Sequence, residues 1–300
     1  MKRFALIGAA GFIAPKHMKA IKDTGNILVA AFDKFDSVGV MDNYFPEADF
    51  FTEFERFDRH VERLKREHKR IDFISVCSPN YLHDAHIRFA LRHQCAVICE
   101  KPLVLNPWNL DALFDIEKET GQRIFNILQL RHHPDIVRLK EKVETSLIPK
   151  KYVIDLTYIT ARGKWYQRSW KGDTDKSGGI ATNIGIHFFD LLIWIFGDVQ
   201  SCTVNLLNDV KSSGMLELQH AQVNWFLSID GKDLPEAIKN NDHQSFRSMI
   251  VDDEEYTFSD GFANLHTTSY QAILDGKGYG VEDVRKSIEL VHLIRNSKVC

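Results

Sequence analysis

Cysteine is scarce in this sequence of 300 residues, and its spacing excludes two classes of protein. The five cysteines are odd in number and form no C-x-x-C pair, which argues against a disulfide framework and against a zinc site. Cys77 and Cys99 fall in apolar, strand-like runs, where a reduced and packed thiol is the expected role. The other three are Cys95, Cys202 and Cys300.

Excess charge is also missing. The formal net charge is -3, so the overall charge gives no reason to expect binding to nucleic acid or to an anionic membrane. The run VERLKREHKR at 61–70 is locally basic, but its charges have helical spacing and follow the mixed-charge segment EFERFDRH. This pattern is typical of a solvated helix face rather than of a binding patch.

Long hydrophobic runs are absent too, since no segment approaches the ~18 uninterrupted apolar residues of a membrane-spanning helix. The N-terminal segment MKRFALIGAAGFIA has two positive charges before an apolar run, as a secretory signal does. A buried first strand with a glycine turn explains it as well, and the segments that follow favour the strand. We therefore expect a cytoplasmic protein with enough chain for two domains.

The first half of the sequence alternates apolar runs with helical patterns. This alternation predicts a parallel sheet with helices on both faces, whose ligands bind at the carboxyl ends of the strands. The expected helices follow the glycine turn in 8–21 and lie at 84–93 and 108–121, the last ending at Gly121. The expected strands are 3–7, 26–33, 71–79, 95–102 and 123–130.

A glycine turn follows the first expected strand, with the pattern G-x-x-G-x-x-A instead of G-x-G-x-x-G. Gly8 permits a tight turn, Gly11 lets the backbone approach a pyrophosphate, and the small Ala14 allows close packing of helix on strand. Asp33 ends the second strand, where an acid bonds a ribose diol and repels a 2′-phosphate, which favours NAD over NADP. Lys34 beside it is a mild argument for the opposite preference.

Polar residues end the third and fourth expected strands on the same edge. Ser78 and Asn80 follow the third strand, and the adjacent acid and base Glu100 and Lys101 follow the fourth. A lone lysine after a strand is usually a solvated loop residue. Its place at the ligand-binding edge favours a functional role for Lys101, with Glu100 orienting it or capping the site.

The second half of the sequence has the residue pattern of an antiparallel sheet. Apolar and polar residues alternate through 221–229, which suits a sheet with one face packed on helices. The other face needs cover, which a second copy of the chain would supply. The expected strands are 150–160, 200–207, 214–219, 221–229 and 246–251.

An apolar helix is expected from Asn183 to Phe196, after a flexible glycine entry. Asn183, His187 and Asp190 fall on one face of it, and polar groups on an apolar helix require a partner or a ligand. The preceding loop is cationic and aromatic, which suits an anionic ligand with a stacking ring. Its residues, with one cation before it, are Arg131, Arg162, Lys164, Trp165, Tyr166, Arg168, Trp170 and Lys171.

Together these features resemble the Gfo/Idh/MocA family of sugar oxidoreductases. The resemblance rests on the glycine turn followed by His17, on SPNYLH and EKP at two strand ends, and on SGGIATNIGIHFFD at 177–190. It implies an NAD-binding Rossmann domain of the α/β class at 1–125. It also implies an α+β domain at 126–300 with a large open, mostly antiparallel sheet, which binds substrate and mediates oligomer contacts, as in a homotetramer.

The resemblance implies that Lys101 is the catalytic lysine and His187 the acid/base residue. Many family members carry Asp four residues before the histidine, where this chain has Asn183. A neutral amide cannot accept the proton, so more of the proton transfer falls on Lys101 and His187, and which of them is the formal base stays open.

The predicted site therefore draws on both halves of the chain, and it includes no metal ligand. The predicted substrate-binding residues are Lys101, Arg131, Arg162, Lys164, Trp165, Asn183 and His187. The predicted cofactor-binding residues are Gly8, Gly11, Phe12, Ile13, Asp33, Lys34, Ser78, Asn80, His83, Glu100, Lys101, Gln129, Trp170 and Lys171.

Longer stretches such as NILQLRHHP at 126–134 are similar to a subgroup of the family that acts in bacterial surface-polysaccharide (O-antigen) biosynthesis. This similarity implies NAD-dependent oxidation of the 3-hydroxyl of UDP-N-acetylglucosaminuronate to a ketone, on which an aminotransferase then acts. Some relatives recycle bound NADH with 2-oxoglutarate. Open alternatives are a dehydrogenase of a free sugar or inositol and a non-enzymatic NAD sensor. A zinc hydrolase built on His132 and His133 is remote, because adjacent histidines on a strand point apart.

Overall fold

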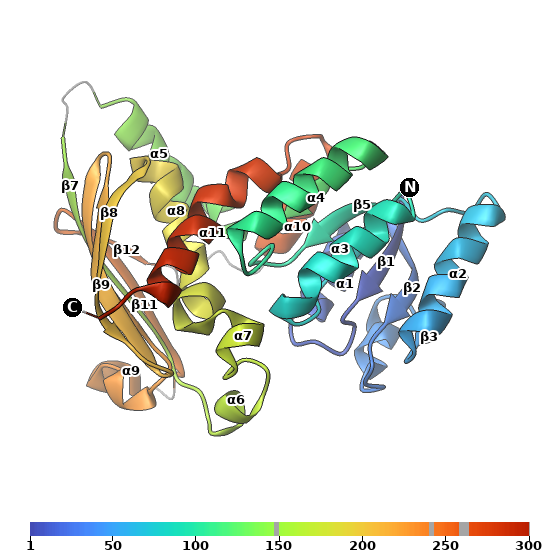
Figure 1. Cartoon of the computed structure of the whole chain (residues 1–300), viewed down its shortest axis with the longest axis horizontal. Helices are drawn as coiled ribbons and strands as arrows, with labels where there is room; N and C mark the ends of the chain where they lie inside the picture. Colours follow the sequence, from blue (N-terminus) through green and yellow to red (C-terminus); the bar gives the residue numbers. More distant parts are fainter. Residues whose placement is uncertain (147–149, 240–242, 258–263, 300) are drawn as a thin grey trace. The chain divides into compact units, whose positions relative to one another are not determined.

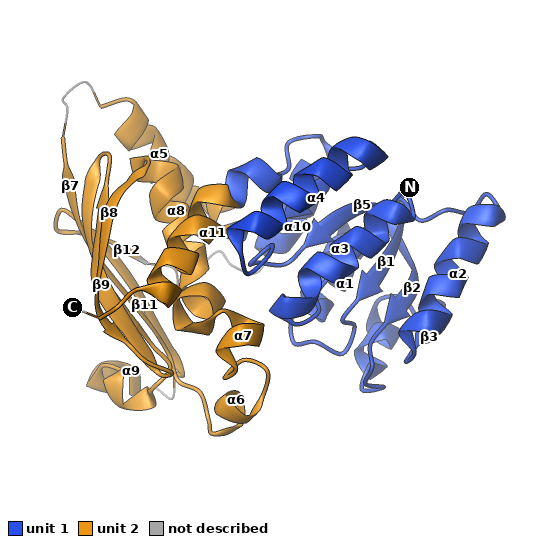
Figure 2. Cartoon of the chain, viewed as in Figure 1, with its two compact units in different colours: residues 1–129, 264–284 blue, residues 130–263, 285–300 orange. Residues whose placement is uncertain are grey.

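The computed structural model describes residues 1–146, 150–239, 243–257 and 264–299, so Cys300 lies outside the described residues (Figure 1). The chain forms two compact units (Figure 2). Unit 1 comprises Met1–Gln129 and Asn264–Val284, and unit 2 comprises Leu130–Ala263 and Arg285–Cys300. The sequence places everything after residue 125 in a second domain, whereas the structure returns Asn264–Val284 to unit 1, where helix α10 packs on α1.

Unit 1 contains a six-stranded sheet in the order β3-β2-β1-β4-β5-β6, and all its strand pairs are parallel. The predicted α/β class is confirmed. The central strand β1 is almost wholly buried because helices cover both faces, which explains its uninterrupted apolar sequence. The strands are β1 Arg3–Ile7, β2 Ile27–Phe32, β3 Asp49–Phe51, β4 Phe73–Val76, β5 Ala96–Cys99 and β6 Ile124–Asn126.

Some strand predictions for unit 1 were too long, and one strand was missed. The run at 123–130 pairs only over Ile124–Asn126, since Gln129 already begins a 3₁₀ turn. Strand β3 is a three-residue edge strand whose first residue is exposed, so it has no apolar alternation that the sequence could reveal.

The helices of unit 1 bury one apolar stripe each. Helix α2 buries Phe57, Val61 and Leu64 and exposes its lysines and arginines, which confirms the solvated face predicted around 61–70. Helix α4 ends at Gly121, whose φ of 65° is the left-handed conformation that glycine accepts easily. The helices are α1 Ala14–Asp23, α2 Phe54–Arg66, α3 His83–Arg92, α4 Pro107–Thr120 and α10 Leu265–Leu274, with 3₁₀ turns at Gly39–Asn43 and Asn80–Leu82. A further 3₁₀ turn, Gln129–His132, begins at the last residue before unit 2 and continues into it.

Unit 2 is built on a second six-stranded sheet, ordered β12-β11-β7-β10-β9-β8. The β10–β7 pair is parallel and the other four pairs are antiparallel, so the predicted mostly antiparallel sheet is confirmed. The four-residue edge strand β12 was not predicted. The strands are β7 Tyr152–Thr160, β8 Val199–Leu207, β9 Lys211–Leu218, β10 Ala221–Ser228, β11 Ser245–Val251 and β12 Glu254–Thr257.

The inner face of this second sheet packs on helix α8, Ile186–Phe196. The rings of Phe189 and Trp225 meet edge to face with centroids 5.4 Å apart, and Trp225 is fully buried, as its alternating pattern predicted. The remaining helical segments are α5 Pro134–Glu144, α6 Trp165–Arg168, α7 Thr174–Ser177, a π-helical segment Ala181–Gly185, η5 Gly231–Asp233, α9 Glu236–Lys239 and α11 Val281–Asn296.

One helical run in the described part of the chain, Thr174–Phe196, is long and apolar enough to cross a membrane by length and composition alone. Its mean hydropathy is 1.5, but 78% of the apolar window is buried inside the protein. The run ends in α8, the core helix under the sheet of unit 2, so packing accounts for its apolar character.

Candidate active site

The register of the parallel sheet aligns four strand ends at one edge of unit 1. Ile7 pairs with Phe32 on one side and with Val76 on the other, and Val76 pairs with Cys99. The residues that follow these positions therefore emerge together. They are Gly8, Asp33, Cys77 and Glu100.

Gly8 begins the turn after β1 in a conformation that other residues rarely adopt, with a φ of 95°. A Cβ atom there would lie 2.6 Å from the carbonyl carbon of Cys77, so a side chain does not fit. The turn leads into the ten-residue helix α1, whose buried Ala14 packs closely behind it. Bare backbone before a helix N-terminus suits a pyrophosphate, so these residues fit a dinucleotide.

Asp33 joins the glycine turn to the end of β2. Its carboxylate accepts a hydrogen bond from Ala10 N (3.0 Å) and another from Phe35 N (3.0 Å), one on each oxygen. Each carboxylate oxygen has a second lone pair, so a ribose diol could still donate to it. Nearby, Phe12 is 93% exposed at the tip of the turn, Ile13 is half-buried, and the ammonium of Lys34 lies over the Phe35 ring.

His83 connects two strand ends through the backbone. Its Nδ1 lies 2.7 Å from Pro102 O and its Nε2 lies 2.8 Å from Ser78 O. Burial lowers the pKa of this imidazole. Ser78 in turn bonds His86 through its hydroxyl (2.8 Å), and Asn80 is buried at the start of a 3₁₀ turn. His83 was predicted to bind the cofactor, and the structure gives its two ring nitrogens backbone partners.

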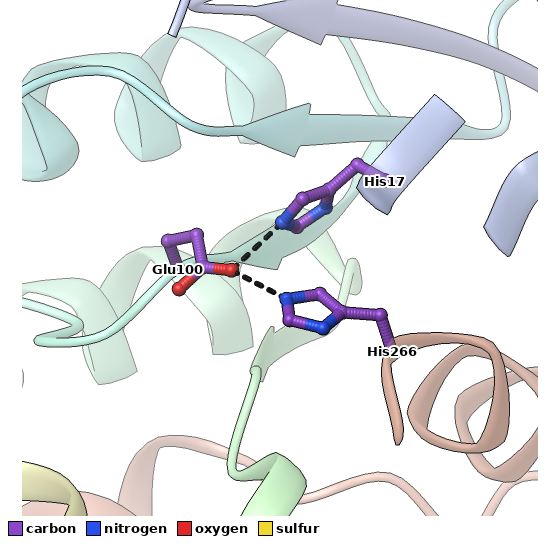
Figure 3. A group of neighbouring side chains, drawn as sticks. All are labelled: His17, Glu100 and His266. Atoms are coloured by element: carbon purple, nitrogen blue, oxygen red, sulfur yellow. Dashed lines mark hydrogen bonds and ion pairs between the residues drawn. The ribbon is translucent and has the colours of Figure 1, made fainter. Parts of the chain in front are cut away.

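Glu100 is buried at the end of β5 and accepts three hydrogen bonds. His17 Nε2 and His266 Nε2 both lie 2.9 Å from its Oε1 (Figure 3). The backbone N–H of Lys101 donates to Oε2 of Glu100 at 3.2 Å. The carboxylate thus holds the backbone of the half-buried Lys101. Sequence reasoning noted His17 but missed His266, since α10 lies far along the chain.

In unit 2 the predicted helix from Asn183 begins as a π-helical segment, Ala181–Gly185, before α8 starts at Ile186. The π geometry changes the angle between successive side chains, so spacing of four does not place Asn183 as in an α-helix. Asn183 donates through Nδ2 to the hydroxyl of Tyr166 at 2.5 Å, and both Asn183 and His187 are half-buried.

Asp190, the third polar residue of that helix, is buried and has a protein partner. Arg131 donates from Nε to Oδ2 (2.9 Å) and from Nη2 to Oδ1 (2.7 Å), and its guanidinium lies 5.4 Å from the Trp194 ring centroid. The partner that the helix pattern required is therefore Arg131. Arg131 was predicted to bind substrate, but in the structure its Nε and Nη2 groups donate hydrogen bonds to Asp190.

Three of the predicted substrate-binding residues in the cationic loop are accessible. Arg162 and Lys164 are exposed, and Trp165 is 52% exposed, while Tyr166 is buried and anchors the loop. The Lys171 ammonium lies 5.3 Å from the Trp165 ring centroid and 5.7 Å from that of half-buried Trp170. Gln129, at the end of unit 1, is half-buried. A cation between two indoles makes a flat, positive surface of the kind that binds an anionic ring compound.

A parallel sheet with a glycine turn and an acid at the next strand end, followed by a mixed sheet, fits a two-domain protein that binds a dinucleotide. The comparison with known families agrees. The chain belongs to the Gfo/Idh/MocA oxidoreductase family, since residues 2–127 match its NAD-binding Rossmann fold and residues 140–223 match its C-terminal alpha/beta domain.

Solved structures of similar sequence cover the whole chain. The WlbA (WbpB) dehydrogenase from Thermus thermophilus, in complex with NAD and alpha-ketoglutarate, is 46% identical, with a TM-score of 0.96 over 100% of this chain and 96% of that one. The same enzyme in complex with NAD and UDP-GlcNAcA gives 45% identity over the same shares. Among curated proteins, D-glucoside 3-dehydrogenase of Escherichia coli K12 is 31% identical, and the match spans 42% of this chain but 36% of that protein.

Proposed function

We propose that this protein oxidises the 3-hydroxyl of UDP-N-acetylglucosaminuronate (UDP-GlcNAcA) to a ketone and reduces NAD. The observation that carries the proposal is the 45% identity, along the whole chain, to a dehydrogenase solved with NAD and UDP-GlcNAcA. Position 3 is further supported by the E. coli relative, which is named as a glucoside 3-dehydrogenase.

NAD, when bound, supplies the hydride acceptor. Gly8 and Gly11 would admit its pyrophosphate to the bare backbone of the turn, and Asp33 would accept from the adenosine ribose and repel a 2′-phosphate. We propose that the remaining predicted cofactor contacts support it from the strand ends and the loop. They are Phe12, Ile13, Lys34, Ser78, Asn80, His83, Glu100, Lys101, Gln129, Trp170 and Lys171.

Proton transfer from the substrate hydroxyl is assigned to Lys101 and His187. A positive ammonium at Lys101 stabilises the developing alkoxide and lowers the pKa of the hydroxyl, and an imidazole at His187 exchanges the proton. Asn183, a neutral amide bonded to Tyr166, orients the substrate without titrating.

The substrate's anionic groups require cations and a stacking surface. Arg162 and Lys164 are exposed and carry positive charge for the pyrophosphate or the uronate carboxylate, while the accessible indole of Trp165 can stack on a ring. Arg131 contributes indirectly in this proposal, because its bidentate bond to Asp190 anchors the helix that bears His187.

The biological setting follows from the same relatives. We propose a cytoplasmic homotetramer in surface-polysaccharide (O-antigen) biosynthesis, with an aminotransferase acting next on the ketone. The Thermus enzyme was solved with NAD and alpha-ketoglutarate, which supports regeneration of NAD on this protein by reduction of 2-oxoglutarate.

Absorbance at the NADH band tests the proposal. Mixing the protein with NAD and UDP-GlcNAcA should produce NADH, and 2-oxoglutarate should remove it while more keto sugar accumulates. The Lys101→Met variant should bind NAD nearly as well, since Lys101 is one of many proposed cofactor contacts, and should lose turnover by about 10²–10⁴-fold, because a charge used in the transition state is gone. Turnover of free glucosides or inositol in preference to UDP-GlcNAcA would contradict the proposal.

A further inference from the structure

Five polar side chains form a continuous buried hydrogen-bonded network behind Lys101. Ser75 Oγ lies 2.7 Å from Tyr270 Oη, which lies 2.7 Å from His17 Nδ1. Nε2 of His17 is hydrogen-bonded to Glu100, and Glu100 is also hydrogen-bonded to His266 (Figure 3). We call Ser75, Tyr270, His17, Glu100 and His266 the Glu100 network; each of the five is at most 7% exposed.

The network joins parts of unit 1 that are remote in sequence. His17 comes from α1 and Glu100 from the end of β5, while His266 and Tyr270 come from α10, 166 and 253 residues along the chain from their partners. Two helices, α1 and α10, therefore hold the carboxylate at the end of β5. That carboxylate also accepts the backbone N–H of Lys101 at 3.2 Å.

We propose that His17 and His266 are positioning residues for Lys101, acting through Glu100, and that the network holds one negative charge beside that lysine. This inference rests on the proposed catalytic role of Lys101.

A count of donors and acceptors supports the negative charge. The hydroxyl of Ser75 can donate to Tyr270, and Tyr270 can donate to His17 Nδ1, so that both histidines donate from Nε2 to Glu100. Every bond is then satisfied with a neutral ring at His17, whose Nδ1 accepts, and one carboxylate, and the proposal takes the His266 ring as neutral too. Burial lowers the pKa of His17, which agrees with a neutral ring. Burial alone would raise the pKa of Glu100, but the bonds from His17 and His266 hold it well below its usual range.

The other titratable groups that face Glu100 do not cancel this charge. Burial raises the pKa of the Cys77 and Cys99 thiols well above the ordinary value, and it does the same for the Tyr270 phenol. Burial also lowers the pKa of His83, which favours the neutral ring, and a neutral ring has one N–H that donates to only one of the Pro102 and Ser78 carbonyls. Among these neighbours the Glu100 carboxylate therefore carries the charge next to Lys101.

A nearby negative charge raises the pKa of an ammonium group, so removing the charge of Glu100 should lower the pKa of Lys101. The sign does not depend on the role of Lys101. If Lys101 acts as the neutral base, its pKa sets the acid limb of the pH–rate profile. If Lys101 acts as the cation, its pKa sets the alkaline limb. In both cases the limb moves to lower pH when the carboxylate is neutralised or displaced.

A bound metal ion is the alternative to direct hydrogen bonds in this network, because the ligand atoms of His17, Glu100 and His266 all lie within 4.8 Å of one another. The distances favour hydrogen bonds. Both histidine nitrogens lie 2.9 Å from a single carboxylate oxygen. Zinc at ~2.0–2.1 Å from tetrahedral ligands would hold them roughly 3.3 Å apart.

The kinetic test uses two substitutions at one position, His266→Leu and the matched control His266→Gln, whose amide can still donate to Glu100. His266→Leu should lower kcat by about ten- to hundredfold, because a displaced catalytic group costs that much, with little change in NAD affinity. His266→Leu should also move to lower pH the limb of the pH–rate profile that Lys101 sets. His266→Gln should recover most of the kcat and most of the limb's original position.

In a Lys101→Met background, His266→Leu should cause little further loss of kcat. Equal loss for Leu and Gln, or the same loss in both backgrounds, would overturn the positioning role.

A second measurement needs no substrate. Long-range ¹H–¹⁵N spectra of labelled histidine should show neutral Nε2–H rings for His17 and His266, identified by their loss in single variants. A charged ring at either position, or one zinc per purified chain that disappears in His266→Leu, would overturn the network as described. Failure of the parent protein to oxidise UDP-GlcNAcA would contradict the proposed function and leave these spectra unchanged.

Discussion

At the scale of single residues, Asp33 does two things with one carboxylate. It fixes the glycine turn through Ala10 N and its own loop through Phe35 N, and it places negative charge where a dinucleotide's ribose is expected. A substitution that removes the whole side chain would disturb the turn as well as the charge. The isosteric amide removes the charge and keeps one of the two acceptor atoms, since its Nδ2 can only donate, so it should disturb the turn less than Ala does.

Asp33→Asn should therefore narrow the preference for NAD over NADP by about tenfold, equal to ~1.4 kcal/mol, because repulsion of the 2′-phosphate is lost. Calorimetric titration with both dinucleotides measures the ratio. Asp33→Ala should narrow the ratio similarly but weaken both affinities, since two backbone amides lose their acceptor. A parent protein that prefers NADP would refute the role given to Asp33.

At the scale of elements, the Arg131–Asp190 pair holds α8 in place. Both side chains are at most 6% exposed, and the bond is bidentate. Breaking a buried pair leaves a charge without compensation, whereas replacing both partners with apolar residues can be nearly neutral. The pair thus makes the position of α8, and of His187 within it, depend on a residue more than fifty positions earlier in the chain.

Arg131→Met should lower the free energy of unfolding by ~3–5 kcal/mol, and the double variant Arg131→Met with Asp190→Leu should recover much of that loss. Urea denaturation followed by tryptophan fluorescence measures both. Arg138→Met is the matched control, because Arg138 is 74% exposed in its bond with Asp135, and it should cost less than ~1 kcal/mol. A similar cost for the two arginines would show that Arg131 is not structural.

At the scale of the whole molecule, the outer face of the second sheet carries exposed apolar side chains. Val153 is 52% exposed, Met215 is 38% exposed and Ile250 is 36% exposed. Cross-strand pairing joins Met215 to Asn224, Asn224 to Asp155, and Asp155 to Ile250. These four residues therefore form one row across the sheet. A face of this kind is suited to burial against another copy of the chain.

If this face forms the proposed homotetramer, Ile250→Lys should shift the protein to smaller species, because burying four lysine side chains in the interface would remove their charges from water. Light scattering coupled to size exclusion gives the mass. Leu293→Lys is the control, since Leu293 is an exposed apolar residue (48%) on helix α11 instead of the sheet. An unchanged mass for Ile250→Lys would remove this face from the interface.

The sequence by itself determined most strands of the two sheets and the residues that follow the strand ends of unit 1. Buried parallel strands are continuous apolar runs, and glycine, proline and charge interrupt them where the chain leaves the core, so the positions of Gly8, Asp33 and Lys101 could be predicted from local pattern. The alternation around Trp225 likewise indicated which face of the second sheet is buried.

Only the tertiary structure decided the partners of the buried polar groups. The short edge strands β3 and β12 have no periodicity of their own and form because a neighbour offers unpaired backbone groups. The bonds of Asp190 to Arg131, and of Glu100 to His17 and His266, join residues 59 to 166 positions apart. Such contacts leave no trace in local spacing, because a buried charge requires a partner but does not specify where along the chain that partner lies.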